Sequence, residues 1–360
     1  MLFYLTNSLV VSKENPEFRG IFDAVKYIAS AAFQGKHLVL ADYDALVLFN
    51  EWFKYDPSLS AFFGGLISNY STMVIPPFVR YYIEIVRELN HTDNKDGVGQ
   101  MEYKDFLDSD CSSQCSLIAE NDNDCKFYRH ILQWFICEKY PNCAITTSFT
   151  HVNGNGGETP SAIIKELEKK HVSVCIVDTD VKFPGDKPKK DSTCVKCREV
   201  NQQQPFYSYL ELNVHEIENI IPKNYLFHIE NWEQNANANK NKESFERICE
   251  DPDIMRYFDI KEGVLRSQSK GDNYYLFGAR CYNKNPEYVN NMTYEEKYDS
   301  GDQRIYPGLS DKALKKVLSW LERRTKLTPP ILMDFQRENW EMIGALLLDF
   351  GIARNSEVVY

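Results

Sequence analysis

The chain has 360 residues, of which 43% are hydrophobic and 13% aromatic, so it can bury one large core or two ordinary ones. Its 41 basic and 52 acidic residues give a net charge of −11, which excludes a protein that coats nucleic acid electrostatically. No apolar run reaches the ~20 residues of a membrane-spanning helix, and the N-terminal segment lacks a secretory signal, so a cytoplasmic protein without membrane contact is expected.

The first predicted elements are a helix and a buried strand. Residues 18–33 place apolar side chains at helical spacing. HLVLADYD then forms a short apolar run that stops on Asp42 and Asp44, as a buried strand does at the carboxyl edge of a parallel sheet. Helical patterns flank a polar stretch further on, and residues 50–140 are interpreted as a helical insertion.

The next segments predict a second strand–helix–strand unit. Residues 144–152 have the β-branched and aromatic content of a strand and run into the glycine turn NGNGG. A helix starting near Thr159 follows, with Pro160 at its first position. HVSVCIVDTD, residues 171–180, is the next strand, and the alternating run YSYLELNV predicts one more strand.

The composition changes near residue 235, where an Asn-rich polar segment predicts a linker or mobile loop. Helical periodicity dominates the segments that follow it. The chain is therefore expected to have an α/β core over residues 1–235 and a mainly helical C-terminal region over residues 236–360.

Two acidic clusters at predicted strand ends carry the chemistry. Asp178 and Asp180 are two residues apart, so a strand would present both on one side. Two carboxylates this close repel unless a cation lies between them, and Mg²⁺ or Mn²⁺ prefers such oxygen ligands. The plainer alternative is that one Asp caps a turn while solvent covers the other. Glu216 and Glu218, in HEIEN, form the second pair and favour the metal site.

These segments together resemble a known domain. CIVDTDVKFPGD followed by ELNVHEIENIIP is similar to the Toprim domain of the overcoming-lysogenization-defect (OLD) type nucleases and of their ATPase-free relatives in bacterial antiphage systems. The preceding SFTHVNGNGGETPS resembles the strand and glycine turn of the same family. The resemblance covers about residues 144–226 and implies a Toprim-like Rossmannoid sheet flanked by helices.

The resemblance also implies the site residues. The family's first motif is a strand ending in Glu-Gly, which supplies a metal-binding glutamate; HLVLADYDAL lacks it, and Asp42 and Asp44 are the nearest carboxylates. YFDIKEGV resembles a later segment in which a lysine, here Lys261, assists catalysis. The expected catalytic residues are Asp42, Asp178, Asp180, Glu218 and Lys261, and the expected metal ligands are Asp42, Asp44, Asp178, Asp180, Glu216 and Glu218.

The implied activity is hydrolysis of DNA or RNA phosphodiester bonds by a nuclease that uses Mg²⁺ or Mn²⁺, with two ions about 3.5–4 Å apart. The resemblance further suggests antiphage defence. Because an unregulated nuclease would harm its host, we expect a controlling protein partner, either an ATPase or another sensor. Whether the chain forms a homo-oligomer stays open. A cluster of lysines in KFPGDKPKK, residues 182–190, could provide a local nucleic-acid contact, although a solvated loop is the plainer explanation.

The sequence also leaves two alternatives to a nuclease open. HLVLADYDALVLF also resembles the nucleophile motif of haloacid-dehalogenase phosphatases. Asp42 would then be the nucleophile, Asp44 the acid/base, Thr146 or Thr147 part of the second motif, and Asp178 and Asp180 the Mg²⁺ ligands. That family expects Thr or Val two residues after the second Asp, and HEIEN would have no role. The non-enzyme alternative is a Toprim-like scaffold that lost its first metal ligand and now senses or binds a partner.

Two groups of cysteines could in principle bind zinc. Cys194 and Cys197 have the spacing of a ligand pair, but no second pair lies nearby. Cys111, Cys115, Cys125 and His130 match no common finger. Free thiols are therefore favoured at all of these positions.

Overall fold

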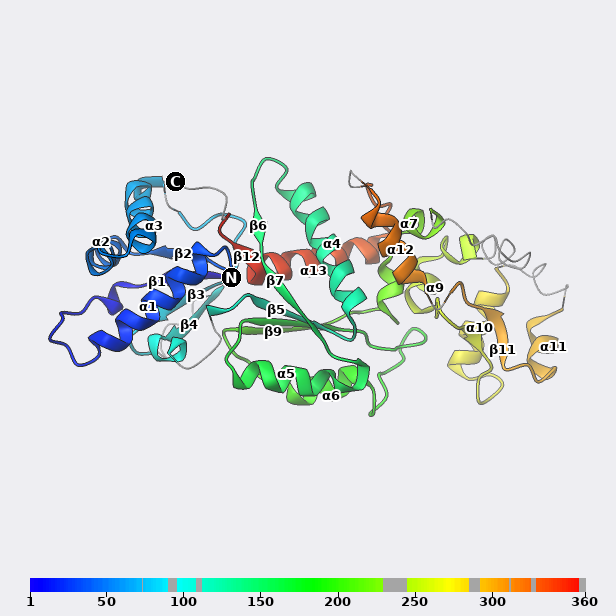
Figure 1. Cartoon of the computed structure of the whole chain (residues 1–360). Coiled ribbons are helices and arrows are strands. Elements are labelled where there is room, and N and C mark those ends of the chain that lie inside the picture. Colours follow the sequence, from blue (N-terminus) through cyan, green and yellow to red (C-terminus); the bar gives the residue numbers. More distant parts are fainter. Residues whose placement is uncertain are drawn as a thin grey trace.

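The computed structural model describes residues 1–72, 74–89, 96–107, 112–228, 245–284, 292–310, 312–324 and 328–355. The molecule is elongated, with one parallel sheet at the N-terminal end, a second in the middle and a smaller lobe at the far end (Figure 1). Parallel sheets flanked by helices confirm the α/β class. None of the described helices is long and apolar enough to cross a membrane.

The first sheet contains four parallel strands in the order β2-β1-β3-β4. Its strands are β1 (Leu2–Leu5), β2 (Leu38–Ala41), β3 (Tyr82–Val86) and β4 (Val98–Glu102). The helices around it are α1 (Phe18–Phe33), α2 (Tyr43–Trp52) and α3 (Pro57–Ser68), with short 3-10 turns η1 (Asn7–Leu9), η2 (Tyr70–Thr72) and η3 (Tyr103–Phe106). The predicted helix over residues 18–33 and the strand before Asp42 are both confirmed.

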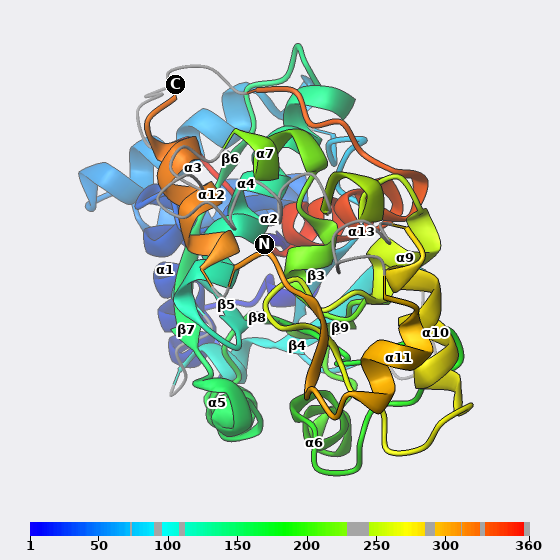
Figure 2. The same cartoon turned by 90° about the vertical axis from the view of Figure 1, so that its right-hand side faces the viewer.

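The central sheet also contains four parallel strands, in the order β7-β5-β8-β9. Its strands are β5 (Cys115–Ala119), β7 (Phe149–Asn153), β8 (Ser173–Val177) and β9 (Tyr207–Glu211). On one face lie α4 (Asp122–Lys139) and α13 (Asp334–Gly351), and on the other α5 (Thr159–Glu168) and α6 (Thr193–Val200) (Figures 1 and 2). The 3-10 turns here are η5 (Gly156–Glu158) and η6 (Ile217–Ile220).

One expectation about this region needs correction. Residues 50–140 are not a helical insertion, because they contain β3, β4 and β5. The strands β7 and β8 of the predicted strand–helix–strand unit are both parallel to β5, which lies between them and pairs with both. Every residue of β5 and of β8 is buried, as expected for inner strands of a parallel sheet with helices on both faces.

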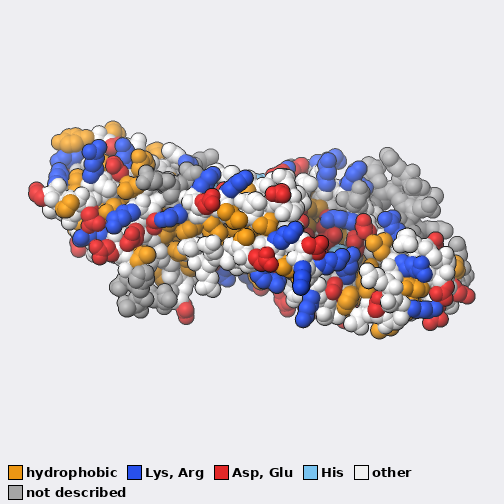
Figure 3. Space-filling model, turned by 90° about the horizontal axis from the view of Figure 1, so that it is seen from below, with side chains coloured by type: hydrophobic (Ala, Val, Ile, Leu, Met, Phe, Trp, Pro, Cys, Tyr) orange, Lys and Arg blue, Asp and Glu red, His pale blue; other side chains and the backbone are white. Residues whose placement is uncertain are grey.

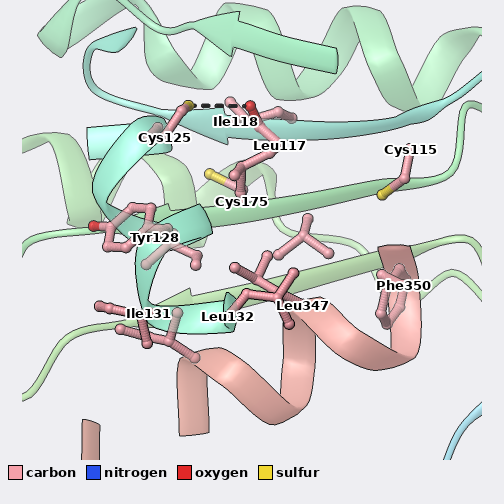
Figure 4. Packing of buried hydrophobic residues seen from close by; sticks show 14 of the residues in the cluster. Cys115, Leu117, Ile118, Cys125, Tyr128, Ile131, Leu132, Cys175, Leu347 and Phe350 are labelled. Atoms are coloured by element: carbon pink, nitrogen blue, oxygen red, sulfur yellow. Dashed lines mark hydrogen bonds between the residues drawn. The ribbon is translucent and has the colours of Figure 1, made fainter. Parts of the chain in front are cut away.

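The core between the central sheet and its helices is closely packed. Figure 4 shows Tyr128 of α4 and Leu347 of α13 among the buried side chains beside β5 and β8. The thiol of Cys125 donates to the carbonyl oxygen of Leu117 at 3.3 Å. At Gly344 an added Cβ would lie 2.4 Å from Cβ of Phe135, so glycine permits the close approach of α13 to α4.

The end of α13 joins the two sheets. The N-terminal ammonium of Met1 donates to the carbonyl oxygen of Ile352 at 2.6 Å, and the guanidinium of Arg80 pairs with the buried carboxylate of Asp349. Strand β12 (Ile352–Ala353) pairs with β6 (Thr146–Thr147). The C-terminal region is therefore part of the core and does not stand apart.

The remaining C-terminal residues form the lobe at the right of Figure 1. It is mainly helical, as expected, with one antiparallel pair of strands, β10 and β11. Its elements and those that lead to it are α7 (Lys223–Phe227), α9 (Pro252–Tyr257), β10 (Gly263–Leu265), α10 (Asn273–Tyr282), α11 (Tyr294–Asp299), β11 (Arg304–Pro307) and α12 (Ala313–Glu322). The predicted Asn-rich linker and the boundary at residue 235 lie outside the described residues.

Candidate metal centre

Two carboxylates lie where β5 ends and α4 begins. Glu120 directly follows β5, and Asp124 is the third residue of α4. Oδ2 of Asp124 accepts the backbone N–H of Asn121 at 3.0 Å, which closes a capping box at the start of the helix. Oδ1 of Asp124 is buried, and no described group hydrogen bonds to it.

Asp178 and Asp180 follow the neighbouring strand. Because β8 ends at Val177, the two carboxylates lie in the loop beyond it, and the expected alternation of strand side chains does not apply. Oδ2 of Asp178 accepts the N–H of Ile217 at 3.1 Å, while Oδ1 is buried without a described partner. Asp180 is exposed and has a φ of 56°, a conformation that Asp tolerates better than most residues.

The two glutamates of HEIEN lie on the 3-10 turn η6, after β9, and not on a strand. Glu216 is the N-cap of the turn, and its backbone N–H donates to Oδ1 of Asn219 at 2.8 Å. The amide of Asn219 also donates to the carbonyl oxygens of Met255 and Phe258. Asn219 therefore ties the turn to α9, and Glu218 is held buried beside Asp178.

Lys261 is the cation of this cluster. Its Nζ lies 3.2 Å from Oε2 of Glu216 and 3.2 Å from Oε2 of Glu218. Two glycines allow its backbone to approach β11: Gly263 has a φ of 84°, and an added Cβ on Gly308 would lie 2.4 Å from the carbonyl oxygen of Lys261. Burial acts to lower the pKa of Lys261, but the carboxylates of Glu218 and Glu216 outweigh it and raise the pKa above its ordinary value.

The acidic cluster consists of Glu120, Asp124, Asp178, Asp180, Glu216 and Glu218, and its members disfavour one another's charge. Burial, followed by neighbouring carboxylates, raises the pKa of Glu120 and of Asp124 to about 7. Burial also raises the pKa of Glu216 to about 7, with repulsion from Glu218 adding to it. For Asp178, burial and four other carboxyls of the cluster raise the pKa well above its ordinary value.

This donor set has the chemistry that divalent cations prefer, although its oxygens would have to move closer together around an ion, since no three of these six carboxylates have ligand atoms within 4.8 Å of one another. One lysine cannot balance so many carboxylates, and Oδ1 of Asp124 and Oδ1 of Asp178 are buried oxygens that lack a described partner. Leaving such atoms unpaired costs free energy, and a cation would relieve both this cost and the repulsion. Oxygen-only ligands are those that Mg²⁺ and Mn²⁺ prefer.

A cleft of about 890 Å³ opens beside the acidic cluster, between the central sheet and the C-terminal lobe. Asp180, Glu216 and Lys261 line it. The rest of its lining is of mixed charge and includes the basic residues Lys182, Lys189 and Arg304 and the acidic residues Asp191, Asp259 and Glu262. In Figure 3, Lys and Arg side chains gather beside acidic ones at the junction of the central part and the right-hand lobe. The basic side chains of this lining could hold a phosphate group beside metal ions.

Asp42 and Asp44, both expected as ligands, are not brought to this cluster. They follow β2, which belongs to the first sheet, and β2 does not pair with β8. Oδ1 of Asp42 accepts the hydroxyl of Tyr4 at 2.9 Å, and Oδ2 accepts the N–H of Asn7 at 2.6 Å. Asp44 is exposed in the first turn of α2. Glu120 lies in the cluster and Asp42 does not, because β5 is the strand next to β8.

The cysteines do not form a cluster with ligand spacing in the described part of the chain. Cys194 and Cys197 are buried free thiols on α6. Cys125 donates to a backbone carbonyl, whereas His130 contacts the hydroxyl of Tyr225 at 3.2 Å. Cys111 lies outside the described residues.

Glu120 and Asp124 are the residues that sequence reasoning missed. The signal was present: SLIA is a short apolar run that ends in Glu120, and Asn121 with Asp124 predicts a capping box for the following helix. SLIAENDND is therefore a short apolar run followed by a carboxylate and the start of a capped helix.

No family model, curated protein or solved structure matches this chain.

Proposed function

We propose that the chain is a metal-dependent nuclease with a Toprim-like catalytic domain. The observation that carries the proposal is the gathering of six carboxylates and Lys261 at the carboxyl edge of a parallel sheet, beside a cleft whose lining includes Lys182, Lys189 and Arg304. The carboxylates follow β5 and β8 and lie on the turn after β9. This order supports the resemblance noted in the sequence, with Glu120 now in its first motif.

The acidic cluster would hold the ions. Asp178 is central, because its carboxyl interacts with Asp124, Glu120, Glu218 and Glu216. Bound Mg²⁺ or Mn²⁺ would supply Lewis-acid chemistry at a phosphodiester, and six carboxylates are sufficient for the two-ion arrangement.

The basic side chains of the protein would position the substrate and stabilise negative charge on it. The Nζ of Lys261 lies at the edge of the cluster and lines the cleft, so it can stabilise negative charge on a phosphoryl oxygen. Lys182, Lys189 and Arg304 can bind neighbouring phosphates of a polynucleotide and hold the strand over the carboxylates. This local basic surface explains how a chain with a net charge of −11 can bind nucleic acid.

The biological setting is proposed by resemblance alone. A nuclease of this kind would act in antiphage defence, under the control of an ATPase or another sensor. Expression of this chain alone would then leave growth normal, whereas expression beside its partner would be toxic.

The phosphatase alternative has less support. It needs Asp42 beside Asp178 and Asp180, but the two sites follow strands of different sheets, and Thr146 and Thr147 pair with β12. The inactive scaffold has less support as well, because Glu120 would supply a carboxylate in place of the first-motif glutamate. Failure of the purified chain to bind Mn²⁺ in calorimetry would return support to it.

Cleavage assays with Asp178→Ala test the proposal. Purified wild-type chain, in excess over labelled DNA or RNA, is expected to show basal cleavage in Mg²⁺ or Mn²⁺ even without its partner and to stop cutting in a chelator, and Asp178→Ala is expected to lose this activity. Asp44→Asn is the matched control, since it removes an exposed carboxylate of the first sheet. Wild-type rates in Asp178→Ala, or hydrolysis of small phosphomonoesters without cleavage of polynucleotides, would refute the nuclease.

A further inference from the structure

A histidine and two carboxylates form a second group at the side of the acidic cluster. His215 precedes Glu216 in the chain, and Asp259 follows α9. One ligand atom from each of these three residues lies within 4.8 Å of the others, and all three residues line the cleft. Among the described residues this is the one such group of His, Cys, Asp and Glu.

The histidine ring is buried without a proper hydrogen bond. His215 is 2% exposed, and neither ring nitrogen has a hydrogen-bond partner among the described groups. Its Nε2 lies 3.7 Å from Oε1 of Glu216 and 3.5 Å from Oδ2 of Asp259. Both separations are too long for a good hydrogen bond. Nε2 of the ring therefore lies between the carboxylates of Glu216 and Asp259 and forms a good hydrogen bond with neither.

These separations match ligand atoms around one small cation. With bonds of about 2.0–2.2 Å, two ligand atoms on a tetrahedral ion lie about 3.4 Å apart. The observed 3.5 Å and 3.7 Å need only a slight contraction. A fourth position would face the cleft, which the same three residues line.

The three ligands are held in place from outside. The backbone N–H of His215 donates to the carbonyl oxygen of Arg256 at 3.0 Å, and its carbonyl oxygen accepts the N–H of Asp180 at 3.0 Å. Oδ1 of Asp259 accepts the N–H of Glu262 at 2.6 Å, which leaves Oδ2 directed at His215. These contacts fix the backbone of His215 and one oxygen of Asp259, while Nδ1 of His215 has no described partner.

We propose that His215, Glu216 and Asp259 form a site for a transition-metal ion such as Zn²⁺ or Mn²⁺, distinct from the oxygen-only acidic cluster. An imidazole ligand favours these ions over Mg²⁺. Glu216 connects the two sites, because its Oε1 faces His215 while its Oε2 faces Lys261. This inference goes beyond the proposed nuclease and does not require it, since it concerns binding of an ion by these three side chains.

The test is a titration of the full-length chain with Zn²⁺. Metal-free protein is placed in excess Mg²⁺, which occupies oxygen-only positions, and Zn²⁺ binding is measured by calorimetry. We expect one Zn²⁺ per chain, and His215→Ala and Asp259→Asn should each weaken binding by roughly tenfold or more. His151→Ala is the matched control, because it removes a histidine that pairs with Asp122 at 2.9 Å outside the cleft.

A spectroscopic readout protects the test against misfolded variants. Co²⁺ in a tetrahedral nitrogen–oxygen site absorbs visible light, and His215→Ala should change the spectrum while leaving far-ultraviolet circular dichroism as in the wild type. Zn²⁺ binding that is absent from the wild type, or that persists unchanged in both His215→Ala and Asp259→Asn, would overturn the inference.

Comparison with cleavage separates this inference from the proposed function. Zn²⁺ binding that depends on His215, in a chain that cuts no nucleic acid, would support the site and refute the nuclease. Cleavage in Mg²⁺ with no His215-dependent Zn²⁺ binding would do the reverse. Asp178→Ala should lose cleavage and retain Zn²⁺ binding if both are correct.

Discussion

The ammonium nitrogen of Lys261 lies 3.2 Å from Oε2 of Glu218, whose side chain is only 4% exposed. Removing the only cation that pairs with a buried carboxylate would destabilise the fold, because the buried negative charge would be left uncompensated. Lys261 also forms an ion pair with Glu216, so one positive charge is shared between two of the six carboxylates in the cluster. The charge on Lys261 is thus positioned both to hold the cluster together and to meet an incoming phosphate.

Lys261→Met is expected to separate these two roles. Loss of one preorganised cation should slow cleavage by about 10²-fold, the scale seen for one donor to a developing negative charge. Metal affinity should stay the same or increase, because the cluster loses its competing positive charge. Single-turnover cleavage in saturating Mg²⁺ and calorimetry with Mn²⁺ measure the two effects.

Lys190→Ala is the control for the loss of a lysine near the cleft. Lys190 is exposed and does not line the cleft. Its removal should change cleavage little. Equal losses in Lys190→Ala and Lys261→Met would mean that only the overall charge matters.

The raised pKa values of the cluster predict how the stability of the metal-free protein depends on pH. The pKa values of Glu120, Asp124 and Glu216 are about 7 in the folded chain, against roughly 4 in an unfolded chain. Between these values the folded state binds more protons, so stability is fully present below about pH 4 and is lost as the pH rises through about 7. Thermal melting in a chelator should therefore occur several degrees lower at pH 8 than at pH 6.

Divalent ions should remove most of this difference. They stabilise the ionised carboxylates, so the melting temperature at pH 8 should rise with added Mg²⁺ or Mn²⁺ and rise less at pH 6. Asp178→Asn removes the central charge and should flatten the pH dependence in the chelator. Melting temperatures that increase from pH 6 to pH 8 without metal would contradict the prediction.

Replacing glycine with alanine is expected to change the free energy of unfolding in opposite directions at two positions. At Gly344 a new Cβ would lie 2.4 Å from Phe135, so Gly344→Ala should force α13 away from α4 and cost about 1–3 kcal/mol of the free energy of unfolding. At Gly64, in α3, the nearest atom would be 4.0 Å away, so Gly64→Ala should stabilise the chain by about 0.5–1 kcal/mol. Urea unfolding of both variants measures the pair. Stabilisation by Gly344→Ala would show that α4 and α13 pack less closely than described.

Much of the fold follows from local pattern. The helix over residues 18–33 has a clear apolar stripe, and the strand before Asp178 is an apolar run between polar segments. The sequence predicts that the acidic residues of HEIEN share one side of a strand, whereas they lie on a 3-10 turn after the strand. A capping box on a short turn and a strand end look alike when only the spacing of two glutamates is available.

The first ligand could not be chosen from local pattern alone. HLVLAD and SLIAEN are both short apolar runs that end in a carboxylate, and both are strands that lead into helices. The two sheets even share one strand order, with the first strand of each between the second and third. What distinguishes Asp42 from Glu120 is the pairing of β8 with β5, a contact between residues more than fifty positions apart.

Glu120→Gln and Asp42→Asn test this choice. Glu120→Gln should abolish cleavage yet raise the melting temperature in a chelator at pH 8, because it removes one of the charges that repel within the cluster. Asp42→Asn should keep the cleavage rate and cost about 1 kcal/mol of stability, because it weakens the acceptor for Tyr4 and for the N–H of Asn7. Parallel cleavage assays and thermal melts reveal both patterns. If Asp42→Asn lost cleavage while Glu120→Gln retained it, the first ligand would be Asp42 after all, and the assignment of β5 to the site would be wrong.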